Sequence, residues 1–179
     1  MKINTLPIRE IVFGLEDGIV STLGVLVGIA IGTNDRALVI LSGLVVIFVE
    51  SLSMAAGTYL SNKSQQEFRL AEDNKNILKR IFHQRQPRLP IRESAFMGVS
   101  YITGGLVSLL SFLVLPVSVA VVSAVLISFV SLFGLGFVKG KLTKINPVKS
   151  GLEMVLVSAS ASLIGFTVGK LAPILLDLQ

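Results

Sequence analysis

The sequence predicts an all-helical integral membrane protein, built as a bundle of five transmembrane helices. Hydrophobic residues make up 52% of the 179 residues, and the mean hydropathy is +0.79. Only 15% of the residues are charged, against about 25% in soluble domains. Five apolar runs have the length of about 20 residues that crosses a hydrocarbon layer about 30 Å thick. They cover residues 10–31, 37–60, 93–115, 117–138 and 149–172.

Helix-start residues mark the beginning of these spans. Proline fits the first turn of a helix, where its missing N–H costs nothing, and four spans have one at or near their start: Pro7, Pro90, Pro116 and Pro147. Asn34 and Asp35 can cap the second span. The first span is a poor secretory signal peptide, because acids interrupt it and no small-residue cleavage site follows it.

Basic residues predict the orientation of the bundle. Segment 61–92 carries eight of them, the link 139–149 carries four lysines, and the N-terminus carries Lys2 and Arg9. By the positive-inside rule these three regions are cytoplasmic, and the C-terminus lies outside. The net charge of +5 therefore reflects topology and contact with lipid headgroups rather than nucleic-acid binding.

Acidic residues inside the apolar spans are the strongest functional signal. Glu16 and Asp17 interrupt the first span, and Glu50 lies in the second span one turn before Met54. Charged groups are costly inside a bilayer and usually have a function there. If the first two spans pack antiparallel, Asp17, Glu50 and Met54 reach a similar depth. Glu10 precedes Asp17 by one heptad and shares its helix face.

Carboxylates and a thioether at one depth favour a site for a divalent cation. Oxygen ligands suit Mn(II), Fe(II), Mg(II) or Ca(II), and the sulfur favours a transition metal. With no cysteine, and with its one histidine outside the spans, the chain lacks the usual ligands for zinc or copper. The predicted ligands are Asp17, Glu50, Met54, Glu10 and Glu16, of which Asp17 and Glu50 are the strongest. Glu16 has no evident basic partner within the spans.

Buried carboxylates can also carry protons, because a low-dielectric environment favours the neutral form and a bound cation favours the charged form. Metal–proton exchange is therefore one hypothesis for the function. A transporter or channel for another cation or small solute is a second, and a non-transporting scaffold or regulator with structural acids is a third. No nucleophile–base constellation is evident across the spans, so an enzyme is not expected.

Glycines line one face of the first span and one face of the last. Gly14 and Gly18 lie four residues apart and are followed by Gly24, Gly28 and Gly32, while the last span has Gly165 and Gly169. Such small-residue faces let another helix approach closely. They fit packing within the chain as well as a dimer in which the cation path runs between or beside the two first helices.

Two segments of the chain resemble the vacuolar iron transporter family. Residues 9–28, REIVFGLEDGIVSTLGVLVG, look like its first helix, and residues 50–65, ESLSMAAGTYLSNKSQ, look like its second. The resemblance implies a five-helix homodimer that moves Fe(II), and often Mn(II), out of the cytosol in exchange for protons. It implies a cell membrane or a vacuole-like organelle membrane as the host. Asp17 then matches the metal-path aspartate, Met54 matches the second-helix methionine, and Glu10 stands where an aspartate is usual.

The chain departs from the family pattern in three places. The family's second-helix glutamate falls at Val46, whereas this chain has Glu50, and Glu16 replaces a small polar residue. The segment 61–92 is short, as in the nodulin-like branch that lacks the cytosolic metal-binding domain. Residues 64–82 have an amphipathic pattern that predicts a helix continuing the second span along the lipid surface. Glu67 and Glu72 in this segment are candidates for capturing metal on the cytoplasmic side.

Overall fold

The computed structural model describes residues 7–73 and 90–175. These residues form helices and no strand: α1 (Ile8–Thr33), α2 (Arg36–Asp73), α4 (Pro90–Val114), α5 (Val117–Thr143) and α6 (Pro147–Leu175). All five helices are long and apolar enough to cross a membrane. The structure therefore confirms the predicted fold class, an all-helical bundle with five spans.

The predicted start signals lie where the helices begin. The Asp35 Oδ1 atom accepts hydrogen bonds from the backbone N–H groups of Ala37 and Leu38, at 2.8 and 3.2 Å. Asn146 caps α6 in the same way. These bonds satisfy N–H groups that have no partner within the helix. Prolines stand directly before α1 and α5 and are the first residues of α4 and α6.

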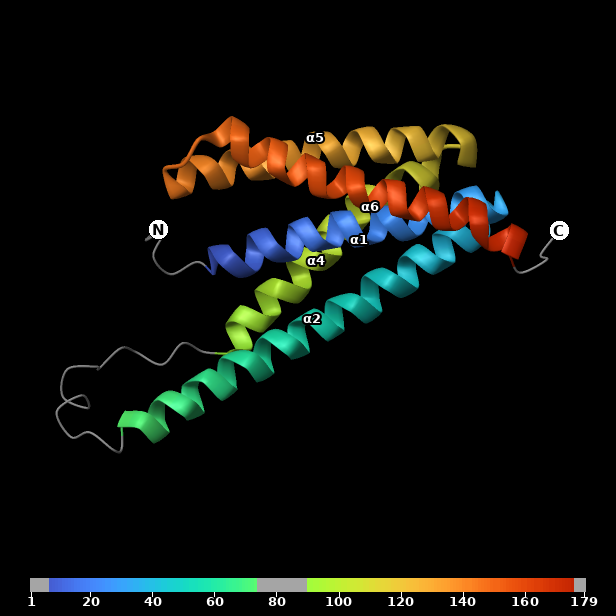
Figure 1. Cartoon of the computed structure of the whole chain (residues 1–179). Helices are drawn as coiled ribbons and strands as arrows, with labels where there is room; N and C mark the ends of the chain where they lie inside the picture. The colour runs from blue at the N-terminus through green and yellow to red at the C-terminus, as the bar shows by residue number, and fades with distance from the viewer. Residues whose placement is uncertain (1–6, 74–89, 176–179) are drawn as a thin grey trace.

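Helix α1 lies at the centre of the bundle and contacts the other four helices (Figure 1). Helices α2 and α4 pack together on one side of it, and α5 and α6 form a hairpin on the other. The start of α1, the end of α2, the start of α4 and the α5–α6 turn share one end of the bundle (Figure 1). This end, called the basic end below, carries Arg9, Lys63, Arg92 and Lys141. The side of the membrane that it faces stays a prediction.

Arg36 is a basic residue at the opposite end, and its role is local. Its Nε atom donates to the carbonyl of Phe112 at 2.8 Å, and its Nη2 atom donates to the carbonyl of Leu113 at 2.5 Å. Both carbonyls belong to the last turn of α4, where no intrahelical N–H is available. Arg36 thus ties the start of α2 to the end of α4.

The glycines of α1 pack against other helices of the same chain. A Cβ added at Gly14 would lie 2.7 Å from the carbonyl oxygen of Met97 on α4, and one at Gly18 would collide with the carbonyl of Tyr101. Farther along α1, a Cβ at Gly24, Gly28 or Gly32 would lie 3.1 to 3.3 Å from a carbonyl oxygen of α6. The small-residue faces therefore serve packing within the chain, which is one of the two roles left open by the sequence.

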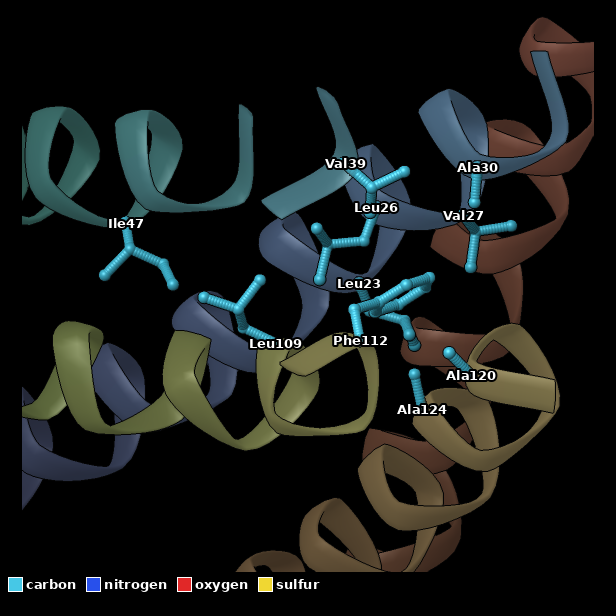
Figure 2. Close-up of a cluster of buried hydrophobic side chains, with 10 residues drawn as sticks. All are labelled: Leu23, Leu26, Val27, Ala30, Val39, Ile47, Leu109, Phe112, Ala120 and Ala124. Carbon is cyan, nitrogen blue, oxygen red and sulfur yellow. The ribbon is translucent and has the colours of Figure 1, made fainter. Parts of the chain in front are cut away.

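A cluster of buried apolar side chains fills the half of the bundle away from the basic end. Figure 2 shows side chains from α1, α2, α4 and α5 converging there, with Phe112 close to Leu23 and with Ala120 and Ala124 beside it. All ten residues of the cluster are at most 3% exposed. The acids of α1 precede this cluster in the chain, so they lie between it and the basic end.

Helix α2 continues well beyond the span predicted for it. The helix runs to Asp73, so the first part of the amphipathic segment 64–82 is helical. The rest of that segment, from residue 74 onward, lies outside the described residues. A membrane-surface position for this extension stays a prediction.

Candidate metal path

Helices α1 and α2 bring together the two acids that the sequence ranked highest. The helices are joined by a tight turn at Asn34 and Asp35, so they run in opposite directions. Asp17 is partly buried on α1, while Glu50 is exposed on α2. Their carboxylates are close enough for the two charges to interact. Helix geometry predicted a common depth for Asp17, Glu50 and Met54; Met54 instead lines a pocket with Glu10, and a metal-binding role for these residues stays a prediction.

A third helix contributes a hydroxyl group to this acid pair. Tyr101 of α4 is fully buried, and its Oη atom lies 2.5 Å from Oγ of Ser21. The Ser21 hydroxyl donates to the carbonyl oxygen of Asp17 at 2.6 Å. Because that uses the only hydrogen of Ser21, the Tyr101 hydroxyl must be the donor to Ser21. Tyr101 also interacts electrostatically with Asp17 and Glu50.

Replacing Tyr101 by phenylalanine is expected to destabilise the fold by about 0.5–1.5 kcal/mol, the usual net value of one hydrogen bond. The thermal unfolding midpoint of the detergent-solubilised protein measures this loss. The chain's other tyrosine, Tyr59, makes no hydrogen bond within the described residues, so Tyr59→Phe is a matched control. Equal midpoints for the two variants would contradict a structural role for the Tyr101 hydroxyl.

A pocket of about 390 Å³ lies at the basic end of the same three helices. Glu10 of α1, Met54 of α2 and Met97 of α4 line it, together with polar side chains that include Ser53, Thr58 and Asn62. Glu10 is only 6% exposed. The structure thus places Glu10 and Met54, two of the predicted ligands, in one pocket.

The predicted ligands do not form a single cluster in one copy of the chain. Within residues 7–73 and 90–175, no three acidic or histidine side chains converge in a way that could hold a metal ion. Glu10 and Met54 belong to the pocket, and Asp17 and Glu50 form a separate pair one heptad farther along α1. One heptad of helix rises about 10 Å, so the two groups follow one another along α1.

Glu16 lies within electrostatic range of a basic residue that the sequence did not suggest, although the two side chains form no ion pair within 4.0 Å. Its carboxylate interacts electrostatically with Lys139 of α5 as well as with Asp17. Lys139 was assigned to the link after the fourth span, but α5 continues to Thr143 and so carries this lysine on the helix. Glu16 does not line the pocket of Glu10 and Met54, and its role as a metal ligand stays a prediction.

Glu67 and Glu72 lie on the extension of α2. The Glu67 carboxylate lies 3.8 Å from the Lys63 ammonium group, and both side chains are more than half exposed. Such a surface pair contributes little to stability. The side chain of Glu72 lies outside the described part of the structure. Metal capture by these two residues stays a prediction.

Met97, Tyr101 and Ser21 were missed by the sequence analysis. Met97 and Tyr101 are four residues apart and share one face of α4. That spacing was a usable signal, but only the order of the helices in the bundle shows that this face meets α1 and α2.

A shallow groove begins one turn beyond Asp17 and follows α1 and α6 away from the basic end. It has a volume of about 860 Å³, starts at Val20 and Ser21, and ends near Thr33 and Pro173. Its other lining residues are almost all glycine, alanine, valine or isoleucine. This α1–α6 groove is thus an apolar surface that begins one helical turn after Asp17.

These features define the chain as a multi-pass membrane protein with acidic side chains inside its spans. The VIT family model matches residues 8–79 and 70–170, which together include α1, α2, α4 and α5 and most of α6. The chain therefore belongs to the vacuolar iron transporter family, a family of metal transporters.

Individual relatives agree with this assignment. The chain is 30% identical to an uncharacterised protein of Methanocaldococcus jannaschii, with 90% of this chain and 88% of that protein covered. It is 23% identical to vacuolar iron transporter 1 of Eucalyptus grandis, covering 91% and 85% of the two chains. It is 27% identical to vacuolar iron transporter homolog 2 of Arabidopsis thaliana, covering 92% and 83%.

The lengths of these alignments differ in an informative way. The alignment with the Eucalyptus protein spans 212 positions, which is more than the 179 residues of this chain, so that relative has residues that this chain lacks. The alignment with the Arabidopsis homolog spans 165 positions. The assignment to the short-loop branch stays a prediction, and the lengths are compatible with it.

Proposed function

We propose that this protein exports Fe(II), Mn(II) or both from the cytosol in exchange for protons. The metal would enter the pocket of Glu10 and Met54 and then pass to Asp17 and Glu50. The observation that carries this proposal is the Asp17–Glu50 pair, in which two spans bring interacting carboxylates together. Two such groups inside a bilayer are costly unless a cation or protons neutralise them.

The chemistry of the path supports exchange rather than simple permeation. Two carboxylates carry two negative charges, which one divalent cation or two protons can balance. When the metal leaves, the low-dielectric layer favours protonation, and the next metal must displace those protons. The hydrogen bonds from Tyr101 to Ser21 and from Ser21 to Asp17 hold this turn of α1 in place during the exchange.

A second copy of the chain would complete the site. Glu50 is exposed in the single copy, and the α1–α6 groove leaves part of an apolar face of α1 uncovered. A carboxylate facing lipid is costly, whereas two copies joined along this face would enclose the acids between their first helices. We therefore propose a homodimer whose basic end faces the cytosol, in a cell membrane or a vacuole-like organelle membrane.

Transport by purified protein in proteoliposomes tests this function. Vesicles with an acidic interior and a metal-sensitive dye inside are given Fe(II) or Mn(II) outside. Uptake should exceed that of protein-free vesicles and should fall when a protonophore removes the pH gradient. If uptake is the same with and without the pH gradient, proton exchange is not part of the mechanism.

Competition separates metal transport from the other hypotheses. Excess Co(II) should compete with Mn(II), and excess Mg(II) should compete less. A proton flux that depends on another solute and is insensitive to Fe(II), Mn(II) and Co(II) would favour a different transporter. No flux of any kind from folded protein would favour a scaffold or regulator.

A further inference from the structure

The pocket at the basic end holds a carboxylate that has no partner among residues 7–73 and 90–175. Only 6% of the surface of Glu10 is exposed. Its carboxylate makes no hydrogen bond or ion pair with any group in the described part of the chain. The carboxylate lines the pocket and has no partner among the described residues, so it is available to a cation that enters the pocket.

Two sulfur atoms line this pocket from different helices. Met54 comes from α2, and Met97 comes from α4 and is only 4% exposed. The backbone of Met97 is held in place, because its carbonyl packs against Gly14 of α1, one turn from Glu10. The next residue, Gly98, packs against α2 at Ala55 and Ser51. This part of α4 is therefore held by close backbone contacts with α1 and α2, the helices that carry Glu10 and Met54.

Met97 differs in its surroundings from a methionine that only fills space. Met154 of α6 is equally buried, at 2% exposure, but it packs with Ile19 and Leu132 in an apolar cluster. Met97 belongs to neither apolar cluster of the described residues and instead lines a pocket with Glu10, several hydroxyl and amide groups, and the exposed residue Arg9 at the start of α1. Met154 therefore serves as a control, because it is a buried methionine with only apolar neighbours in its cluster.

We propose that Met97 is a metal ligand that, with Glu10 and Met54, forms a site of one carboxylate and two thioethers for a soft or borderline divalent cation. Thioethers bind transition metals and discriminate against Mg(II) and Ca(II). This pocket would then select the metal before it reaches the carboxylates of Asp17 and Glu50, which are all-oxygen ligands. The inference rests on the proposed function and adds the step at which the cation is chosen.

A comparison of Met97→Leu with Met154→Leu tests this role in the full-length protein. Both changes keep the side-chain volume nearly constant. Two properties are measured: the shift of the thermal unfolding midpoint caused by Cd(II), a soft probe, and the KM for Fe(II) in proteoliposomes. Met97→Leu should lose at least half of the Cd(II) shift and raise the KM about tenfold, with little change in maximal rate. Met154→Leu should behave as the wild type.

A second pair of variants isolates the sulfur from the packing. Met97→Cys keeps a soft ligand, and Met97→Ser is nearly the same size without one, so the cysteine variant should keep more of the Cd(II) shift. Equal Cd(II) shifts for cysteine and serine, or equal behaviour of the two leucine variants, would overturn the role of Met97. If the wild type transports metal in that case, only this inference fails. If the wild type neither transports Fe(II) nor responds to Cd(II), the proposed function fails as well.

Discussion

Replacing Asp17 by asparagine is expected to reduce proton-driven uptake of Fe(II) or Mn(II) by about 100-fold. The amide has the same shape as the carboxylate, but it carries no charge and cannot bind or release a proton at physiological pH. Glu50 would then face the cation alone from an exposed position on α2. The initial rate of dye-detected uptake at saturating metal measures the effect. The unfolding midpoint should stay close to that of the wild type, because the Ser21 bond goes to the backbone carbonyl of Asp17.

The neighbouring acid provides the control for this experiment. Glu16 interacts with Lys139 of α5, so Glu16→Gln should leave most of the transport intact. Equal losses in the two variants would mean that the summed charge of α1 matters rather than the Asp17 site. Wild-type uptake by the Asp17→Asn variant would remove Asp17 from the path. If both variants instead unfold, the acids of α1 are structural, as the scaffold hypothesis requires.

The same assay tests whether Glu50 replaces the glutamate that the family has at the position of Val46. Glu50→Gln should lower uptake strongly, because it removes the second charge of the pair. Val46 lies one turn earlier on the same face of α2, so adding Val46→Glu to this variant should restore part of the uptake. Failure of this second-site change to restore any uptake would mean that depth along the path is as important as charge.

The fold class could be predicted because its signals are local. The length of an apolar run is set by the thickness of the bilayer. Asp35 and Asn146 cap helices by accepting hydrogen bonds from backbone N–H groups two residues later in the chain. The proximity of Asp17 and Glu50 could also be predicted, because a short turn joins α1 and α2 and so fixes the depth of one acid relative to the other. These predictions required no knowledge of how distant helices pack.

The residues that were missed depend on the order of the helices. Spans that face lipid are apolar on all sides, so the pattern of α5 and α6 does not reveal which face is turned inward. Lys139 could be assigned to Glu16 only when the length of α5 and its place beside α1 were known. Met97 and Tyr101 belong to a helix that follows α2 after a long segment, so the sequence does not specify their depth relative to Asp17.

Replacing Gly18 by alanine is expected to destabilise the fold strongly. The added Cβ would collide with the backbone carbonyl of Tyr101, and Gly105 N would lie 3.1 Å away. Neither is the end of a flexible side chain, so α1 and α4 would have to separate, at a cost of about 1–3 kcal/mol. Because Asp17 and Tyr101 lie at this contact, uptake should fall together with the unfolding midpoint.

Gly134 of α5 offers a control with the opposite expected sign. Nothing lies within 4 Å of a Cβ added there, and alanine is favoured over glycine within a helix by about 1 kcal/mol. Gly134→Ala should therefore keep or raise the midpoint and leave uptake unchanged. A Gly18→Ala variant as stable as Gly134→Ala would show that α1 and α4 can move apart freely. The contact between them could then not be what holds Tyr101 beside Ser21 and Asp17.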